Sequence, residues 1–196
     1  KYNTNVHVLP TTIDLINVHN RSTDHAAKPI VIGWTGTHTT MHYLNFLFPI
    51  LEKLEAKHDF IFRVISNEEP KYELESLEFV KWKKETEIED LASISIGVMP
   101  LTDTIWAKGK CGFKGLQYMA LEIPSILSPV GVNTSIIEEG VNGFLCASSE
   151  EWESTLERLI LDQELRTQIG TAGKQAIKDR FSVEANKIHY ASALNS

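Results

Sequence analysis

The chain has 196 residues, enough for one α/β domain, or at most two small ones, with a sizeable core. Hydrophobic residues make up 42% and charged residues 23%, which is ordinary for folded proteins and excludes disordered and fibrous classes. The formal net charge of −7 argues against a nucleic-acid partner, because such a protein must neutralise phosphates.

The cysteine count indicates the compartment of the protein, and the start of the chain bears on whether it has a leader. Cys111 and Cys146 are too few for a disulfide framework, which is typical of a reducing compartment. The sequence begins without Met, and it carries neither a charged-then-apolar leader nor an apolar run of about 18 residues. We therefore expect a mature or excised piece of a soluble, cytoplasmic protein that forms a single domain over 1–196.

Short apolar segments alternate with longer segments of helical periodicity along most of the chain. The predicted strands are 6–9, 30–33, 60–65, 78–82, 94–99, 125–127 and 143–146. The predicted helices are 40–57, 86–92, 113–121, 134–138, 150–161 and 163–180. We interpret 1–28 as a linker or first strand and 181–196 as a C-terminal helix.

Local signals set several of the predicted helix boundaries. Apolar residues three and four apart between Leu44 and Leu54 predict one amphipathic helix. Thr86 followed by Glu89 predicts a capping box, in which the two side chains satisfy free backbone amides. Asn133 is the predicted N-cap of the helix at 134–138.

Strands that alternate with helices predict parallel pairing, because a crossover helix is the usual return to the same sheet edge. The segments 94–99 and 125–127 are almost wholly apolar, as expected for strands that are covered on both faces. We therefore predict an α/β fold with a doubly wound, Rossmann-like parallel sheet. Ligands of such sheets bind beyond the carboxyl ends of the strands, so the loops after residues 33, 65, 99 and 127 are the first candidates.

The loop expected after residue 33 reads Gly-Trp-Thr-Gly-Thr and runs into a helix. Glycines let the backbone approach a ligand, and the free amides at a helix start attract anions. A tight strand–helix turn is an equally good interpretation, since the third glycine of the dinucleotide fingerprint is absent. The nucleotide-binding candidates in this loop are Gly33, Thr35, Gly36 and Thr37.

Neither metal chemistry nor covalent chemistry has a strong signal in this sequence. His38 and His42 stand four apart, but the metalloprotease motif needs Glu where Thr39 stands, so a surface pair is favoured. Cys111 has no base placed beside it by the sequence, and we interpret it as a small packed residue. We expect no metal site.

A Gly/Lys-rich loop follows the predicted strand at 94–99. Lys108, Lys110 and Lys114 fall within seven residues of one another, although the whole chain is acidic. Loop lysines are usually solvated, but these stand at the predicted ligand edge and beside a helix start near Gly112. The helix N-terminus together with Lys110 and Lys114 is a candidate cradle for a diphosphate. The third loop, at 128–135, adds Gly131 as a candidate.

These three loops, in this order, resemble the C-terminal, donor-binding domain of GT-B glycosyltransferases of retaining family 4, also called group 1. The most specific stretch is 109–126, Gly-Lys-Cys-Gly-Phe-Lys-Gly-Leu-Gln-Tyr-Met-Ala-Leu-Glu-Ile-Pro-Ser-Ile. It is similar to the family's Glu-x-Phe-Gly…Glu-Ala-Met-Ala-x-Gly-x-Pro-Val segment. Residues 128–131 and 136–145 match the next two blocks, and the resemblance covers roughly 6–182.

Two departures from the family pattern concern its paired glutamates, which correspond to Gly109 and Gln117 here, so both carboxylates are missing. In relatives the second Glu holds ribose hydroxyls, and the Gln117 amide could do the same. The first Glu lies near the donor sugar; Gly109 cannot replace it, and Asp103 is a candidate only by its proximity. The Arg and Lys of the family's first Gly-rich loop are also absent, so charge for a diphosphate would come mainly from Lys110 and Lys114.

The resemblance implies transfer of a sugar from a nucleoside-diphosphate sugar, of UDP or GDP type, to a glycan, lipid or small-molecule acceptor with retained anomeric configuration. Lys114 would stabilise the departing diphosphate without a metal ion or other cofactor. An N-terminal acceptor-binding domain of the same chain would complete the cleft, and the helix at 181–196 would pack toward it. That domain could also bring the enzyme to the inner face of the cell membrane. The 196 residues alone are expected to bind a donor but to transfer nothing.

Two alternatives stay open. A non-catalytic nucleotide-sugar-binding module would account for the loss of both glutamates. A GT-B-type nucleotide-sugar epimerase would require His and acidic residues along the cleft, and these loops are poor in both. The sequence does not specify the base, the sugar or the acceptor.

Overall fold

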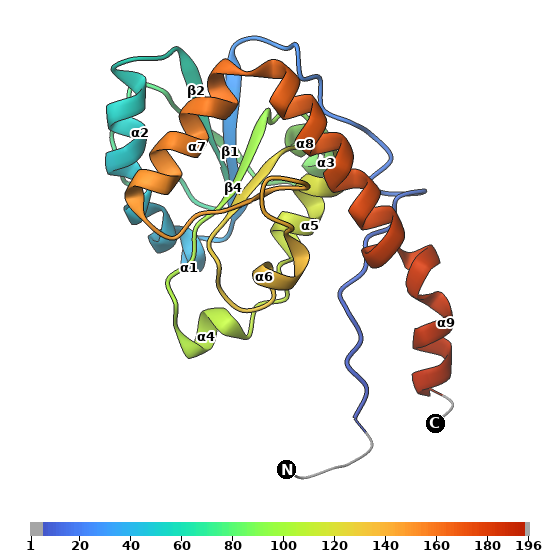
Figure 1. Ribbon diagram of the computed structural model, residues 1–196. Helices are drawn as coiled ribbons and strands as arrows, with labels where there is room; N and C mark the ends of the chain where they lie inside the picture. Colours follow the sequence, from blue (N-terminus) through green and yellow to red (C-terminus); the bar gives the residue numbers. More distant parts are fainter. Residues whose placement is uncertain (1–5, 195–196) are drawn as a thin grey trace.

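The computed structural model describes residues 6–194, and a six-stranded sheet with helices on both faces forms its centre (Figure 1). The strands are β1 (Ile30–Gly36), β2 (Phe60–Ser66), β3 (Leu77–Lys81), β4 (Ile96–Met99), β5 (Ser125–Leu127) and β6 (Phe144–Leu145). Their order is β3-β2-β1-β4-β5-β6, and every neighbouring pair is parallel. The predicted doubly wound, Rossmann-like α/β fold is therefore confirmed.

Helices connect the strands and follow the last one. They are α1 (His38–Met41), α2 (Phe48–Glu55), α3 (Glu87–Ala92), α4 (Ile105–Lys108), α5 (Phe113–Ala120), α6 (Asn133–Ile136), α7 (Ser149–Leu161), α8 (Gln163–Ala176) and α9 (Val183–Leu194). A 3-10 turn, η1 (His42–Phe46), precedes α2, and a π-helical turn, η2 (Ile177–Phe181), follows α8. The helices predicted at 113–121 and 150–161 thus correspond closely to α5 and α7.

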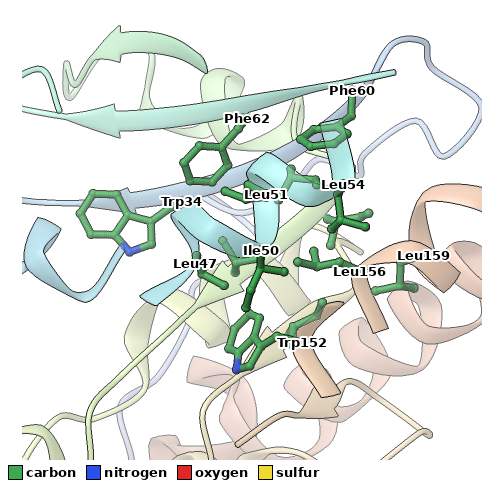
Figure 2. Packing of buried hydrophobic residues seen from close by; sticks show 14 of the residues in the cluster. Trp34, Leu47, Ile50, Leu51, Leu54, Phe60, Phe62, Trp152, Leu156 and Leu159 are labelled. Atoms are coloured by element: carbon green, nitrogen blue, oxygen red, sulfur yellow. The ribbon is translucent and has the colours of Figure 1, made fainter. Parts of the chain in front are cut away.

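Alternating side chains of the central strands supply two separate cores, because successive residues of a strand point to opposite faces of the sheet. On one face α2 and α7 pack over the strands, and Figure 2 shows α2 side chains lying between the sheet and α7. On the other face α3 and α5 cover the sheet through clusters that include Leu91, Leu116 and Tyr118. Both faces of β4 and β5 are covered, which explains why these strands are almost wholly apolar.

The predicted strand at 6–9 is wrong. Residues 6–12 have no regular structure, and Val8 is 90% exposed. The segment meets the rest of the fold at Ile13, which forms a single parallel bridge with Ser182 beside η2 and α9. Farther along, the Thr23 hydroxyl donates to the Ile94 carbonyl, so this segment lies along the α3 side and does not extend the sheet.

The predicted continuous helix at 40–57 is divided into α1, η1 and α2. Pro49 stands in the first turn of α2, where its missing N–H costs nothing. In a continuous helix the same proline would remove a hydrogen bond and clash with the preceding turn. The apolar periodicity is helical, as predicted, but α2 begins only at Phe48, where Pro49 falls in the first turn.

Both predicted helix caps are also wrong. The Thr86 hydroxyl donates to the Asp90 carboxylate at 2.7 Å instead of accepting a free amide, because Thr86 already has helical backbone angles. Asn133 is the first residue of α6, and its side-chain amide donates to the Ser128 carbonyl at 2.9 Å. A capping box does form in the described chain at the start of α7, between Ser148 and Glu151.

Candidate functional site

The strand order reverses at the centre of the sheet, between β1 and β4. These two strands pair only through Ile32 with Ile96 and Gly33 with Gly97, whereas β1 pairs with β2 along its whole length. The carboxyl ends of β1 and β4 therefore separate, and such a reversal opens the crevice in which doubly wound sheets bind ligands. This crevice is the candidate functional site.

Tyr118 of α5 fills the inner end of the crevice. Its hydroxyl accepts the backbone N–H of Thr35 at 3.0 Å and donates to the Val98 carbonyl at 3.5 Å, so it bridges the diverging strands. Complete burial raises the pKa of the Tyr118 phenol, which stays protonated. The bare Cα of Gly97 leaves room for the ring, since a Cβ there would come within 2.5 Å of it.

The first Gly-rich segment is strand, not loop, for most of its length. β1 extends to Gly36, so Gly33, Thr35 and Gly36 lie in the sheet, and only Thr37 of the four candidates lies in the connection to α1. A Cβ on Gly33 would meet the Ile94 side chain at 2.4 Å, which accounts for this glycine by packing.

Backbone amides in this segment are largely engaged within the protein. The Thr35 amide donates to Tyr118, and the His38 amide donates to the side chain of Asn67 at 2.8 Å. The expected cradle of free amides after β1 is therefore reduced. Positive charge at the crevice comes from side chains instead.

Lys114, in the first turn of α5, is the central cation of the crevice. Its Nζ lies 4.9 Å from the centre of the Trp34 ring and 3.5 Å from the Thr40 hydroxyl. A Cβ on Gly36 would come within 2.3 Å of the Trp34 ring and 2.7 Å of that Nζ, so this glycine leaves room for both side chains. Burial, and then the nearby Lys110, lower the pKa of Lys114 to about 8.

The three loop lysines differ in their partners. Lys108 forms an ion pair with Asp103 at 2.9 Å. Lys110 lies over the Tyr43 ring, 5.7 Å from its centre. Within 6–194, neither Lys110 nor Lys114 has a carboxylate within ion-pair distance. These two cations could therefore be neutralised by an anionic ligand, and the attraction would be strong where water is partly excluded.

Gln117 follows Lys114 by one helical turn and is 4% exposed. Its amide nitrogen lies 3.4 Å from the Glu87 carboxylate and 3.5 Å from Nε2 of His19. Sequence analysis did not identify Glu87 or His19, because neither belongs to a motif and His19 is 98 residues away from Gln117. Only the folded chain brings them together.

The backbone conformation and the close neighbours of residue 131 require a glycine there. Its φ is +60°, and a Cβ there would come within 2.8 Å of the Lys108 carbonyl oxygen. The glycine thus lets the loop after β5 lie directly against α4. The atoms nearest to a Cβ at Gly131 belong to the Lys108 backbone, so the assignment of Gly131 as a binding residue stays a prediction.

Two of the hollows among residues 6–194 lie beside the loops that follow β2, β4 and β5. One, of about 250 Å³, lies at the ends of β4 and β5 and is lined by Tyr43, Phe46, Pro100, Leu101, Thr102, Asp103, Ser128 and Ala147. The other, of about 300 Å³, lies beside α1 and the loop after β2 and includes His38 and His42. The two histidines have different partners: His38 contacts Asn67, and His42 contacts the Thr39 carbonyl.

Helices in the described range 6–194 are all too short or too polar to cross a membrane. In the same range, no group of three or more His, Cys, Asp or Glu side chains is arranged to hold a metal ion.

Comparisons with known proteins extend these observations. The sequence profile of the family described as Glycosyl transferases group 1 matches residues 29–162. No curated protein matches the chain. Among solved structures, the chain is similar to the C-terminal domain of LpcC, a glycosyl transferase group 1 family protein from Francisella tularensis. The TM-score is 0.62 at 19% identity, over 84% of this chain and 89% of that domain.

Two larger proteins have the same fold over part of their length. A TarM mutant from S. aureus, solved with fondaparinux, alpha-GlcNAc-glycerol and UDP, gives a TM-score of 0.76 at 12% identity, over 100% of this chain and 41% of that one. HepE from Anabaena, solved with UDP-glucose, gives 0.69 at 15% identity, over 86% and 49%. The chain thus spans about half, or less, of these two proteins, and at such identities the likeness shows the fold alone.

Proposed function

Because the chain belongs to the group 1 glycosyltransferases and has the Rossmann-like fold of a GT-B C-terminal domain, we propose that it is the donor-binding half of a retaining glycosyltransferase. Its ligand would be a nucleoside-diphosphate sugar, and the sugar would pass to a glycan, lipid or small-molecule acceptor. The observation that carries this proposal is the pair Lys110 and Lys114, two cations without carboxylate partners in the described chain, at the crevice between β1 and β4.

The diphosphate would lie against Lys114 and Lys110. When the bond between sugar and phosphate breaks, the departing diphosphate gains negative charge, and a fixed ammonium group stabilises that charge. Gly36 leaves room for the Lys114 Nζ, which lies over the Trp34 ring. With this charge supplied by side chains, we propose that no divalent cation or other cofactor is needed.

The nucleotide would be of UDP or GDP type. Support for UDP comes from the similar structures of TarM and HepE, which contain UDP or UDP-glucose. Of the residues predicted from the sequence, we keep Gly36, Thr37, Lys110, Lys114 and Gln117 in the proposed site. Gly33, Thr35 and Gly131 would act by shaping the backbone.

The acceptor would be held by an N-terminal domain of the same protein, toward which α9 would pack. We also propose a cytoplasmic enzyme of polysaccharide biosynthesis that works at the inner face of the cell membrane. These assignments rest on the family and not on contacts of this chain.

Titration calorimetry with UDP and GDP tests donor binding directly. We expect Lys114→Ala to weaken binding by about tenfold or more, because a charge-assisted contact to phosphate is lost. Lys108→Ala is the matched control, since it removes the same charge from the same loop but from a lysine that is paired with Asp103. Equal losses in the two variants would contradict the role of Lys114, and an absence of nucleotide binding by the native chain would contradict the function.

A second candidate is a module that binds nucleotide sugars without catalysis. Two observations favour it: Gly109 has no side chain, and Gln117 is an amide where the family carries a carboxylate. Sugar transfer by a protein that contains both domains would exclude this candidate. Nucleotide binding without any turnover would support it.

A further inference from the structure

Large apolar side chains are exposed in three neighbouring segments that follow β4 and β5. Ile105 and Trp106, adjacent on α4, are 93% and 79% exposed. Two further exposed residues stand close to them in the fold, Phe113 at the start of α5 and Val132 directly before α6. We call Ile105, Trp106, Phe113 and Val132 the α4 patch. The proposed donor crevice uses none of these side chains.

Close backbone packing fixes the segments that carry the patch. A Cβ on Gly131, the residue before Val132, would lie 2.8 Å from the Lys108 carbonyl oxygen, so the loop after β5 lies against α4. A Cβ on Gly112 would lie 3.4 Å from the Val132 side chain, which places Val132 beside the start of α5. The Thr104 hydroxyl caps α4 by accepting the backbone amide of its third residue at 3.1 Å. The patch is therefore one surface on a fixed support.

The patch protrudes and is not an enclosed pocket. Figure 1 shows α4 at the outer end of the connection between β4 and α5, with α6 near it. An open hollow of about 510 Å³ runs along α4 and is lined by Ile105, Trp106, Gly109 and Lys110. A small ligand would stay in water on most sides there, whereas ligand sites usually bury most of the ligand. An extended partner surface fits this shape better.

Positive charge borders the patch. Between residues 100 and 121 the chain carries three lysines and a single acidic residue, Asp103, although its net charge is −7. Asp103 pairs with Lys108, whose side chain nevertheless stays 57% exposed. Lys110, which lines the hollow, has no carboxylate at ion-pair distance within 6–194. An anionic surface would therefore be attracted to this side of an otherwise acidic molecule.

This combination of residues matches the surface of a bilayer that contains anionic lipids. An exposed Trp prefers the level of the lipid headgroups, where its ring lies among apolar groups and its N–H stays hydrated. An Ile beside it can enter the acyl region, and lysines near the surface are attracted by lipid phosphates. Interfaces between proteins are also rich in Trp but are depleted in Lys, so a protein partner fits the patch less well.

We propose that the α4 patch docks the chain on an anionic lipid bilayer, with Ile105 and Trp106 entering the interface and Lys108 beside the lipid phosphates. The contact is peripheral, since α4 has only four residues. Phe113 and Val132 would lie at its rim, because they are only 42% and 39% exposed. The inference deepens the proposed function, on which it rests for the choice of a membrane, and assigns the contact to residues of this chain.

Co-sedimentation with vesicles tests the docking. The native chain should bind vesicles of phosphatidylcholine and phosphatidylglycerol in equal parts, and should bind phosphatidylcholine alone much more weakly. Trp106→Ala should weaken binding to the mixed vesicles by about tenfold or more, because a large apolar side chain no longer leaves water. Trp82→Ala is the matched control, since Trp82 is also exposed and follows β3 at the same edge of the sheet but lies outside the patch. It should bind as the native chain does.

Lipids with brominated acyl chains measure whether Trp106 enters the bilayer, since bromine quenches the fluorescence of a nearby indole. Trp34 and Trp152 are buried, so the quenching would come from an exposed tryptophan. Trp106→Phe should still bind the vesicles but lose most of the quenching, whereas Trp82→Phe should keep it. Native quenching in Trp106→Phe would overturn the insertion of Trp106.

Two lysine variants separate docking from donor binding. Lys108→Ala should weaken vesicle binding and leave UDP affinity unchanged, whereas Lys114→Ala should do the reverse. If the native chain does not bind the mixed vesicles, or if Trp106→Ala binds them as the native chain does, the docking is overturned and the UDP titration decides the proposed function separately. Vesicle binding without any nucleotide binding would contradict the proposed function and leave the docking surface in place.

Other partners of the patch would give different results. In a protein that contains both domains the quenching should persist, and its loss would show that the second domain covers α4, which overturns the docking. A native dimer that Trp106→Ala dissociates, as measured by sedimentation velocity, would assign the patch to a second copy of the chain and overturn it as well. Thermal unfolding of each variant should match that of the native chain, since the substituted side chains are exposed.

Discussion

At the scale of single residues, neighbouring lysines have different chemistry because their surroundings differ. Lys108 is exposed and paired with Asp103, whereas Lys114 is enclosed by Trp34, Thr40 and Gly36 without a carboxylate partner among the described residues. An ammonium group that has lost water without gaining an opposite charge becomes a weaker base. Lys114 is thus a cation whose charge is easily lost, and an anionic ligand would restore it.

Donor binding should therefore depend on pH through Lys114. The pKa of this lysine in the free protein is lowered to about 8, and a bound diphosphate would raise it. Binding takes up a proton above the free pKa, so affinity should be full at about pH 7 and fall by up to about tenfold per pH unit above about pH 8.

Titrations of UDP at about pH 7 and about pH 9.5 measure this dependence. Lys114→Ala should bind weakly at both values, with little difference between them, whereas Lys108→Ala should behave like the native chain. An affinity that stays constant over this range in the native chain would contradict a titrating Lys114.

At the scale of elements, helix ends depend on backbone conformation that residue type alone does not determine. Thr86 and Ser148 both precede an acidic residue by three positions, yet only Ser148 forms a capping box. Ser148 has extended backbone angles, with ψ of 160°, whereas Thr86 has ψ of −2° and is already helical. The motif thus stabilises a helix only where the preceding loop enters at the required angle.

Ser148→Ala should lower the free energy of unfolding by about 1 kcal/mol, since it leaves an amide at the start of α7 without its acceptor. Chemical denaturation measures the change. Ser154→Ala, an exposed serine within the same helix, is the control and should change stability by less than about half of that amount. A similar loss in both variants would show that the cap contributes nothing of its own.

At the scale of the whole molecule, the distribution of charge is informative. The net charge is −7, yet the crevice carries two lysines without carboxylate partners among residues 6–194. Most acidic residues lie on exposed surfaces, as along α7, where Glu150 and Glu151 stand in the first turn. An acidic exterior around a basic crevice would direct a diphosphate to one place on the surface.

The isolated chain should bind a nucleotide but should not transfer sugar. The reason is that the proposed acceptor site belongs to a second domain, and the chain spans about half, or less, of the TarM and HepE chains that share its fold. A donor-hydrolysis and transfer assay, with and without an N-terminal domain joined to the chain, measures this. Transfer by the isolated chain would contradict the expected division between domains.

The same assay of the protein with both domains, run in EDTA, should give unchanged transfer if no divalent cation is needed.

The sequence by itself determined the sheet and the family, and it singled out the two lysines of the proposed site. Apolar segments that alternate with amphipathic helices leave few folds open, and the cluster of lysines after β4 stands at a strand end, where such folds bind ligands. These signals are local, so they can be recognised along the chain. The predicted strand at 6–9 failed because local apolarity does not say whether a segment finds a neighbouring strand.

Only the tertiary structure decided which groups face the crevice. It showed that β1 runs on to Gly36, that Tyr118 takes the Thr35 amide, and that Lys114 rather than Lys108 lacks a carboxylate partner among the described residues. It also brought His19 to Gln117 across 98 residues. The physical reason is that burial and pairing depend on contacts between distant segments, whereas periodicity and motifs record only what neighbours in the chain impose on one another.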